Sequence, residues 1–321
     1  MQLVRQLSDI IIPGNQRTVL TIGAYDGVHR GHRHIIANVQ KSAAHHRASS
    51  ALITFHPRPK AVFAPHLKSD YLTTLDEKIH VFGTLGLNIV AVLPFTLEFA
   101  QTPAQTFIEQ VVEALRPIEI WAGADFRFGK DQQGDISFLA KLGRMMDFTV
   151  KGVDLQAVNG KRVSSTQIRE MLLAGQMRQA AHLLGDYPFL EGVVEKGAQR
   201  GHTLGFPTAN IAVNEDKLLP RNGVYAVWMQ VAGQTYPAVA NIGIRPTFDE
   251  NKKTVEVHIF DFSEDIYEQQ VRVDLVEFIR PEINFAGRGL DALVAQIGDD
   301  VVQARQILAS ENREWGVGSR E

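Results

Sequence analysis

Residues 18–36 read TVLTIGAYDGVHRGHRHII, and this stretch decides the fold of the first half of the chain. The run TVLTIG is apolar and rich in β-branched residues, which is typical of a buried strand, whereas apolar positions after His29 recur at helical spacing. A glycine-rich turn separates the two. A strand, a tight turn and a helix in this order are typical of an open α/β sheet, which binds ligands where its strands end.

Four more short apolar runs follow this unit, and amphipathic stretches separate them. Further strands are predicted at 50–55, 88–95, 118–123 and 149–155, and helices at 32–46, 75–86, 104–115 and 135–146. Strands separated by helices imply right-handed crossovers and a parallel sheet with helices on both faces. The first part of the chain is therefore predicted to be a Rossmann-like, doubly wound α/β domain.

The pattern changes near residue 186. Two helical stretches, 164–175 and 177–185, each end in a glycine, as helices with a left-handed C-cap do. Short apolar runs with turn residues between them follow at 191–197, 223–231, 236–243, 254–262 and 269–279, before a final helix at 290–308. Strands at this close spacing predict an antiparallel barrel or sandwich. We therefore predict two domains, residues 1–186 and 187–321.

Composition excludes several kinds of chemistry. The chain has 321 residues, 45% of them hydrophobic and 21% charged, which is ordinary for a globular protein of two domains. A formal net charge of −3 gives no general attraction to nucleic acid or to anionic membranes. The absence of cysteine excludes disulfides, thiolate metal sites and cysteine nucleophiles. With neither a signal sequence nor an apolar run near the ~20 residues of a membrane span, we expect a cytoplasmic protein.

His29 and His32 lie at the predicted start of a helix, where free backbone N–H groups favour phosphate. Histidines at this spacing are more often surface or core residues than a site, and a zinc site lacks a third ligand at suitable spacing nearby. GADFRFGKD (123–131) has one residue too many between its glycines for a Walker A loop, and GRGLDA (287–292) lies outside any βαβ unit. The context favours phosphate binding.

The segment GAYDGVHRGH (23–32) resembles the signature of the nucleotidyltransferase superfamily. TFHPRP (54–59), GADFRFG (123–129) and VSSTQIR (163–169) are similar to its FAD-synthetase branch. The resemblance implies that His29 and His32 stabilise charge at the α-phosphate of ATP and that Arg169 clamps the distal phosphates. It implies nucleotide-binding roles for Gly23, Asp26, Gly31, Asp125, Ser164, Ser165 and Thr166. The three hydroxyl residues are also ordinary N-cap candidates, and both interpretations can hold.

KGAQRGHTLGFPTANI (196–211) resembles the flavokinase signature. PRNGVYAV (220–227), ANIGIRPTF (240–248) and VEVHIFDF (255–262) follow in that family's order. The resemblance implies that Thr208 and Asn210 hold Mg²⁺ and the nucleotide phosphates, since oxygen ligands suit that hard cation. It makes Glu256 the base that takes the proton of the riboflavin 5′-hydroxyl, although an exposed strand glutamate is usually only a solvated charge. It adds binding roles for Gly205, Asn241 and Arg245.

Nearly the whole chain thus resembles the bacterial bifunctional riboflavin kinase/FAD synthetase family. The resemblance implies an FMN adenylyltransferase domain at 1–186 and a six-stranded flavokinase-like barrel at 187–321. It implies riboflavin, FMN, FAD and ATP as ligands and Mg²⁺ as cofactor, with no nucleic-acid or membrane partner. The alternatives are another adenylyl- or cytidylyltransferase and an inactive flavin-binding regulator. The chain departs from the family at Ala24-Tyr25, where Asn-Phe is common, at His202 in place of Arg, and at Glu268 in place of Gly.

Overall fold

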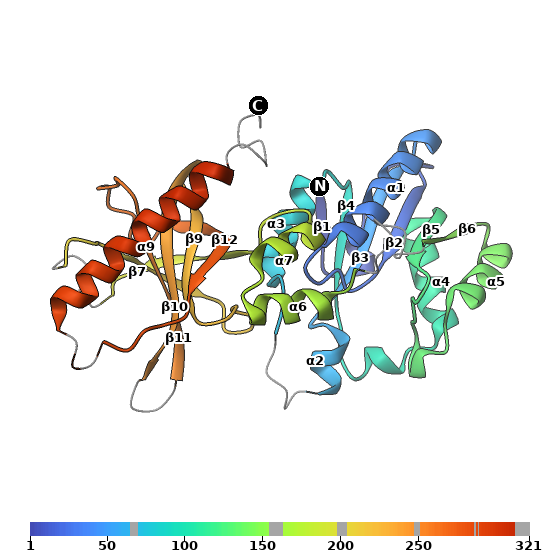
Figure 1. Ribbon diagram of the computed structural model, residues 1–321. Coiled ribbons are helices and arrows are strands. Elements are labelled where there is room, and N and C mark those ends of the chain that lie inside the picture. The colour runs from blue at the N-terminus through green and yellow to red at the C-terminus, as the bar shows by residue number, and fades with distance from the viewer. Residues whose placement is uncertain are drawn as a thin grey trace. The chain divides into compact units, whose positions relative to one another are not determined.

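The computed structural model describes residues 1–64, 70–153, 163–197, 204–246, 251–285, 287 and 289–311, without the side chains of 244–246, 251 and 252. The chain divides into two compact units, Met1–Ser165 and Thr166–Glu321 (Figure 1). Each unit has its own sheet. The domain boundary predicted at 186/187 stays a prediction.

The first unit contains a parallel sheet, as predicted, and the sheet has six strands in the order β1-β4-β3-β2-β5-β6. Its strands are β1 (Gln2–Val4), β2 (Thr18–Ile22), β3 (Ser49–His56), β4 (Ile89–Pro94), β5 (Pro117–Gly123) and β6 (Thr149–Val153). Five of them match the predicted runs to within a few residues. Strand β1 was missed because three residues are too few to show a pattern.

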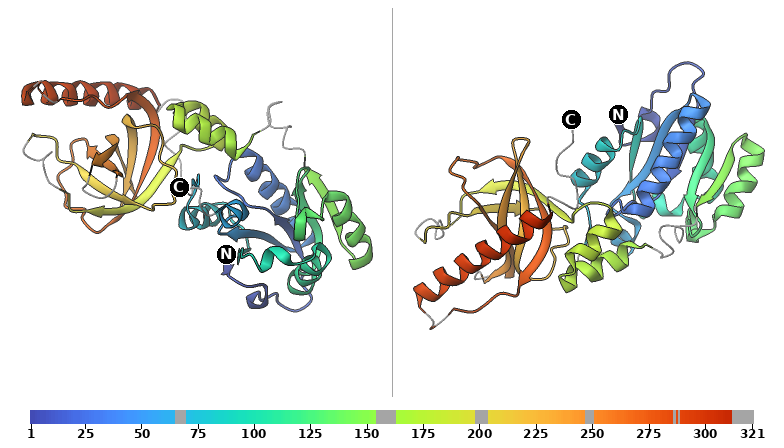
Figure 2. Two further views of the ribbon diagram at one scale, coloured as in Figure 1. Left: turned by 90° about the horizontal axis from the view of Figure 1, so that it is seen from below. Right: turned by 45° about the horizontal axis from the view of Figure 1, so that its top comes forward.

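Helices cover both faces of this sheet (Figures 1 and 2). Val19 of β2 packs with Val39 of α1 on one face, whereas the next residue, Leu20, packs with the core that includes Ile108 and Leu139 on the other. Successive strand residues point to opposite faces, so one strand serves both layers. The helices are α1 (Arg30–His46), α2 (Pro59–Phe63), α3 (Leu75–Thr84), α4 (Ala104–Leu115) and α5 (Ile136–Met146), with 3₁₀ turns η1 (Leu7–Asp9), η2 (Phe99–Gln101) and η3 (Lys130–Gln132).

The strand order places a switch point beside β2. This strand pairs in parallel with β3 on one side and with β5 on the other. Ligands of open α/β sheets bind at such a switch, outside the carboxyl ends of the strands. The loops that follow β2 and β5 hold the GAYDGVHRGH and GADFRFG motifs, so the topology brings both motifs to the same edge.

The second unit is a closed antiparallel barrel in the order β10-β11-β8-β7-β12-β9, which settles the choice between barrel and sandwich. Its strands are β7 (Phe189–Glu195), β8 (Ala209–Val213), β9 (Gly223–Val231), β10 (Gln234–Pro246), β11 (Asn251–Ile259) and β12 (Gln270–Arg280). The predicted final helix is α9 (Leu290–Glu311). It packs on the barrel's outer face, where its Ala304 and Leu308 meet Ala226, Val239 and Val276 (Figure 1).

Helices α6 (Ser165–Ala174) and α7 (Met177–Leu184) also pack on this barrel. The backbone N–H of Arg221 donates to the Leu172 carbonyl at 3.1 Å. Arg178 pairs with Glu277 of β12 and, at 2.7 Å, with Glu311 at the end of α9. The side chain of Glu311 is almost fully buried, so this ion pair satisfies a carboxylate that water cannot reach.

A barrel fragment that keeps α6 and α7 is therefore expected to be more stable than one that begins at Tyr187. Removing the two helices takes Arg178 away from Glu311 and leaves the hydrogen bond from Tyr187 to its carboxylate, and loss of a partner by a buried charged group costs about 1–3 kcal/mol. Urea unfolding of fragments 166–321 and 187–321 measures the difference in the free energy of unfolding. Equal unfolding midpoints would show that α6 and α7 contribute nothing to the barrel.

Candidate active sites

The first candidate site begins at His29, the N-cap residue of α1. Its Nδ1 accepts the backbone N–H of His32 at 3.4 Å, so a neutral His29 carries its proton on Nε2, where it can donate. The turn before it is tight. Tyr25, Gly27 and Val28 all have positive φ angles of 51°, 82° and 39°, which only the glycine adopts without strain.

The rings of His29 and His32 stack on each other, with centroids 3.6 Å apart and planes 14° from parallel. Burial lowers the pKa of His29 to about 4, against a smaller opposing effect of Asp26. The pKa of His32 lies well below its usual value because of burial and because His29 and Lys78 are close. Nδ1 of His32 is shielded and has no hydrogen-bond partner within the described part of the chain. Near pH 7 the pair is thus uncharged.

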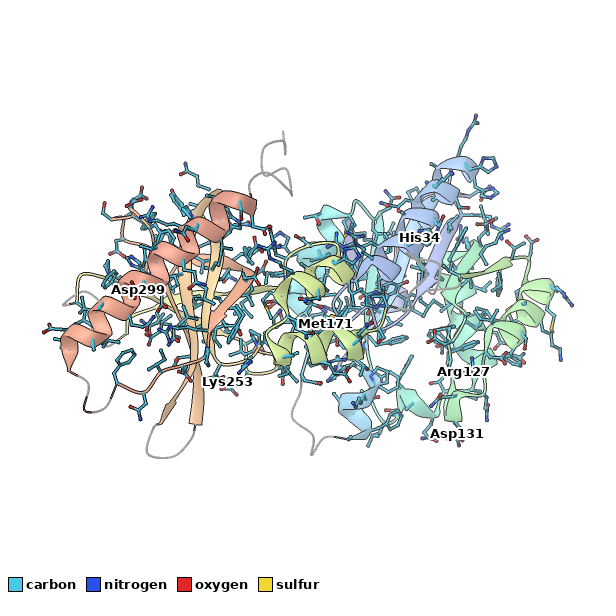
Figure 3. The ribbon with its side chains drawn as sticks, viewed as in Figure 1. His34, Arg127, Asp131, Met171, Lys253 and Asp299 are labelled. Carbon is cyan, nitrogen blue, oxygen red and sulfur yellow. The ribbon has the colours of Figure 1, made fainter. Side chains whose placement is uncertain are left out.

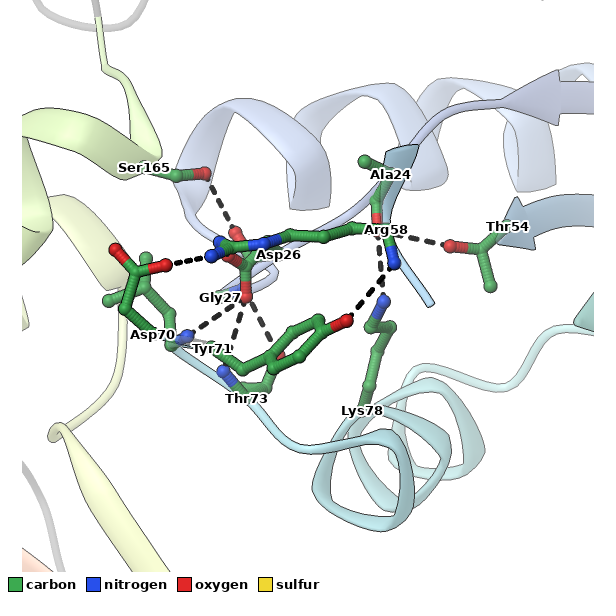
Figure 4. A network of polar contacts seen from close by, with 11 residues as sticks. Ala24, Asp26, Gly27, Thr54, Arg58, Asp70, Tyr71, Thr73, Lys78 and Ser165 are labelled. Carbon is green, nitrogen blue, oxygen red and sulfur yellow. Dashed lines mark hydrogen bonds and ion pairs between the residues drawn. The ribbon is translucent and has the colours of Figure 1, made fainter. Parts of the chain in front are cut away.

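Asp26 holds the loop between β2 and α1 in place (Figure 4). Its buried carboxylate accepts the backbone N–H groups of Leu72 at 3.0 Å and Thr73 at 3.3 Å, and pairs with Arg58 at 3.0 Å. Arg58 comes from the TFHPRP motif and also pairs with Asp70. The contacts show a structural role for Asp26, and its predicted role in nucleotide binding stays a prediction.

Ser165 of the VSSTQIR motif contacts the same loop. The hydroxyl of Ser165 donates to the backbone carbonyl of Asp26 at 2.9 Å (Figure 4). Ser164 and Thr166 flank it at the start of α6, and Arg169 follows one turn later on that helix. The structure therefore brings Ser165 to the loop after β2, although the two residues are more than a hundred positions apart in the sequence.

The remaining predicted residues of this site lie near the same edge of the sheet. Gly23 directly follows β2, and an added Cβ there would come within 3.0 Å of the Tyr25 ring. Gly31 is buried in the first turn of α1. Asp125 follows β5 with its side chain exposed, in the loop that continues through Arg127 to Asp131 (Figure 3). These positions agree with the expected ligand edge.

The second candidate site is a row of polar residues across three barrel strands. Glu256 of β11 pairs with Asn210 of β8 on one side and with Asn241 of β10 on the other. Residues directly opposite each other in a ladder point to the same face. That face is the outer one, because Asn241 lies two residues from Val239, which packs toward α9. The buried Val255 and Val257 point the other way, into the barrel.

A cavity of about 300 Å³ lies over Glu256 and Asn241 of this row. The barrel supplies its polar wall and α9 supplies Leu293 and Ile297. Its lining also includes Phe206, Thr208, Asn241, Glu256, His258 and Arg280. A second cavity, of about 480 Å³, lies beside it and is lined by Pro207, Thr208, Ala209 and residues 262–267. Thr208 is common to both, so it stands between them.

Two glycines let side chains of this site approach the backbone. A Cβ at Gly197 would collide with the amide of Asn210, and a Cβ at Gly243 would collide with the carboxylate of Glu282. Gly205 has a φ angle of 84°, which favours glycine. Close side-chain contacts thus favour glycine at 197 and 243, and the backbone conformation favours it at 205.

The comparisons with known proteins match each half of the chain to a family model. The family model for FAD synthetase matches residues 11–167, and that for riboflavin kinase matches residues 184–308. The chain is 38% identical to the bifunctional riboflavin kinase/FMN adenylyltransferase of Listeria monocytogenes, over 91% of this chain and 92% of that one. It is 37% identical to the protein of the same name from Escherichia coli, over 95% and 97%.

The chain belongs to the bifunctional riboflavin kinase/FMN adenylyltransferase family.

A crystal structure from Streptococcus pneumoniae has the same fold as this family member, with a TM-score of 0.85 and 30% identity over 94% of this chain and 98% of that one. That protein is described as a macrolide-efflux protein. Among the described residues of the present chain, no helix is long and apolar enough to cross a membrane.

One departure from the family has a structural explanation. Glu268 has a φ angle of 64°, the left-handed conformation in which glycine carries no penalty. The glycine typical of the family is thus the residue that this turn favours, and the chain accepts a strained glutamate there. The other barrel departure, His202, and the side chain of Arg245 lie outside the described residues, so their predicted roles stay predictions.

Three residues at the sites were not singled out from the sequence. Nδ1 of His258 lies 2.8 Å from the Pro207 carbonyl, which ties β11 to the residue before Thr208. Arg280 donates two hydrogen bonds, of 2.7 and 2.6 Å, to the carboxylate of Asp300 on α9. The neighbouring Asp299 is exposed (Figure 3). The Nζ of Lys78 donates a hydrogen bond to the backbone carbonyl of Ala24 in the loop after β2. The only signal in the sequence was the face that His258 shares with Glu256.

Proposed function

We propose that the chain makes FAD from riboflavin in two ATP-dependent steps. In the barrel, the riboflavin 5′-hydroxyl attacks the γ-phosphate of ATP and yields FMN and ADP. In the parallel-sheet unit, the FMN phosphate attacks the α-phosphate of a second ATP and yields FAD and pyrophosphate. The observation that carries this proposal is that each unit matches one of the two family models and holds its own polar site.

Glu256 accepts the proton of the 5′-hydroxyl in the first step. Its place on the wall of the cavity under α9 assigns this cavity to riboflavin, because a base must lie within hydrogen-bond reach of the proton it takes. Phe206 and the aliphatic residues of α9 give the cavity apolar walls that suit a flavin ring. ATP then occupies the neighbouring cavity, with its phosphates at Thr208, which lines both.

Thr208 and Asn210 fit the predicted Mg²⁺. They are two residues apart where the chain enters β8, so their oxygen-bearing side chains share one side of the backbone. Mg²⁺ takes few protein ligands and completes its shell with water and substrate phosphates, so two neutral oxygens suffice. When bound, it neutralises charge on the transferred phosphoryl group.

His29 and His32 act in the second step as uncharged N–H donors to the α-phosphate. Donors that are fixed in advance where negative charge develops lower the barrier without reorganisation. Arg169 and the hydroxyls of Ser164, Ser165 and Thr166 hold the distal phosphates at the start of α6, where the helix dipole also favours anions. The transfer is a single in-line displacement, with no covalent enzyme intermediate.

Incubating the purified chain with riboflavin, ATP and Mg²⁺, and separating the products by chromatography, tests the proposal. We expect FMN to appear first and FAD to follow. No consumption of riboflavin would favour another nucleotidyltransferase or an inactive flavin-binding regulator. The predicted cytoplasmic location stays a prediction that cell fractionation can check.

Replacing Thr208 by valine is expected to raise the Mg²⁺ concentration that half-saturates FMN formation by roughly tenfold or more, as loss of metal-site contacts does. Valine keeps the shape and removes the oxygen. Thr208→Ser, which keeps a hydroxyl, is the matched control and should stay near the wild-type value. An unchanged Mg²⁺ requirement in the valine variant would remove Thr208 from the metal site.

A further inference from the structure

Lys78 is a buried cation next to the histidine loop. It lies in the first turn of α3, and its side chain is 1% exposed. Its Nζ donates to the backbone carbonyl of Ala24 at 3.0 Å (Figure 4). Within the described residues it has no carboxylate partner at ion-pair distance. A buried charge without an ion-pair partner is costly, so its presence requires a reason.

The groups around Lys78 are engaged with one another. The nearby carboxylate of Asp26 is already bound by Arg58 and by two backbone N–H groups. The hydroxyl of Thr54 donates to the same Ala24 carbonyl, also at 3.0 Å. Two donors, one from α3 and one from β3, therefore fix the position of one carbonyl oxygen.

This pull determines where the next N–H group points. In a trans peptide the C=O and N–H bonds point in opposite directions. Holding the Ala24 carbonyl toward Lys78 and Thr54 thus turns the N–H of Tyr25 away from these two donors. In the part of the chain that the structure describes, no protein acceptor takes this N–H. A fixed N–H without an acceptor at the end of β2 is suited to a phosphate oxygen.

Helix α3 supports the loop at a second point. Phe82 lies one turn after Lys78 and meets the ring of Tyr25 edge-on, with centroids 5.9 Å apart. The Tyr25 ring in turn lies 4.8 Å from that of His32. A capping box between Thr74 and Glu77 fixes the start of the helix just before Lys78. The helix, the loop and the catalytic ring therefore form one continuous contact.

We propose that Lys78 is a positioning residue for adenylyl transfer: its ammonium group holds the Ala24 carbonyl so that the Tyr25 N–H and His32 face the nucleotide phosphates. Its positive charge also lies under the anionic substrate. This inference rests on the proposed FAD synthesis. It assigns to α3 a role that none of the motifs carries.

The charge of Lys78 gives the proposal a pH signature. Burial lowers the pKa of Lys78 to about 8; Asp26 opposes this shift and Arg58 adds to it. The other titratable groups that face this region are His32 and Tyr25, whose pKa values are lowered and raised by burial, respectively. The ammonium is present below pH 8 and is lost above it. FAD formation by the wild type should therefore decline above pH 8, and Lys78→Arg, which stays charged, should not show that decline.

The experiment uses the full chain with Lys78→Met and Lys78→Arg. Initial rates of FMN to FAD are measured against ATP, FMN and pH, and riboflavin phosphorylation by the same protein serves as internal reference. We expect Lys78→Met to lower kcat for FAD formation roughly a hundredfold, the effect of a small misplacement of reacting groups. The kinase rate should stay within about twofold. Lys41→Met, at an exposed position on α1, is the matched control.

Several results would overturn the inference. Near-normal FAD formation by Lys78→Met would show that the loop needs no ammonium group. Parallel loss of both activities with a lowered melting temperature would assign Lys78 to folding alone. An identical decline above pH 8 in wild type and Lys78→Arg would remove the charge from the mechanism. If the wild type itself formed no FAD, the proposed function would fail instead, so the two failures are distinguishable.

Discussion

Glu256→Gln is expected to lower riboflavin phosphorylation by about 10²–10⁴-fold, the usual contribution of a general base. Glutamine keeps the shape of the side chain and can still donate to the 5′-hydroxyl oxygen, but it cannot take the proton. Riboflavin affinity should survive, because the walls of the cavity under α9 are unchanged. FMN supplied from outside bypasses this step, so the variant should still make FAD from FMN at close to the wild-type rate.

The measurement pairs the initial rates of the two half-reactions with riboflavin affinity from fluorescence quenching. Glu215→Gln, at an exposed position after β8, is the matched control for loss of a carboxylate. If Glu256 were only a solvated strand residue, its replacement would leave kinase turnover untouched. Near-normal turnover would therefore exclude it as the base, and loss of both rates would indicate a folding defect.

His32→Ala is expected to lower FAD formation from FMN by about 10²–10³-fold while riboflavin phosphorylation continues. The imidazole is a donor fixed by its stack on His29, and removing one such donor at a charged transition state has an effect of this size. His32 is the cleaner choice of the two, because His29→Ala also removes the N-cap of α1.

The control for this variant is His34→Ala, at an exposed position on the same helix (Figure 3). It removes an imidazole without touching the loop, so both activities should stay near the wild-type values. Equal loss of both activities in a folded His32→Ala protein would contradict two separate sites. Retention of FAD formation would exclude the ring as a phosphate donor.

The sequence predicted the strands and helices better than it predicted which strands pair with each other. Apolar runs separated by amphipathic stretches indicated the parallel sheet, and that prediction is confirmed. Alternation alone left barrel and sandwich open, because closure depends on pairing between distant strands such as β7 and β12. Strand β8 was hidden in a turn-rich segment, and helix α2 has only five residues, too few to show helical periodicity.

The same limit applies to the sites. Motifs predicted which residues matter in GAYDGVHRGH and PTAN, because short spacing places their side chains near one another. Lys78 and His258 act through single contacts to the backbone carbonyls of Ala24 and Pro207. Each contact joins segments about fifty residues apart, and no local pattern marks a side chain that reaches a distant carbonyl. Only the folded chain shows those two contacts.

The row of Asn210, Glu256 and Asn241 limits where the strands of this barrel can gain or lose a residue. Side chains alternate along a strand, so one residue inserted in β11 ahead of Glu256 would turn its carboxylate into the apolar interior and bring a neighbouring valine to the cavity. A deletion would do the same. Insertions and deletions that preserve kinase activity are therefore expected in the turns between strands. Engineered loops and natural differences in length can both be accommodated there.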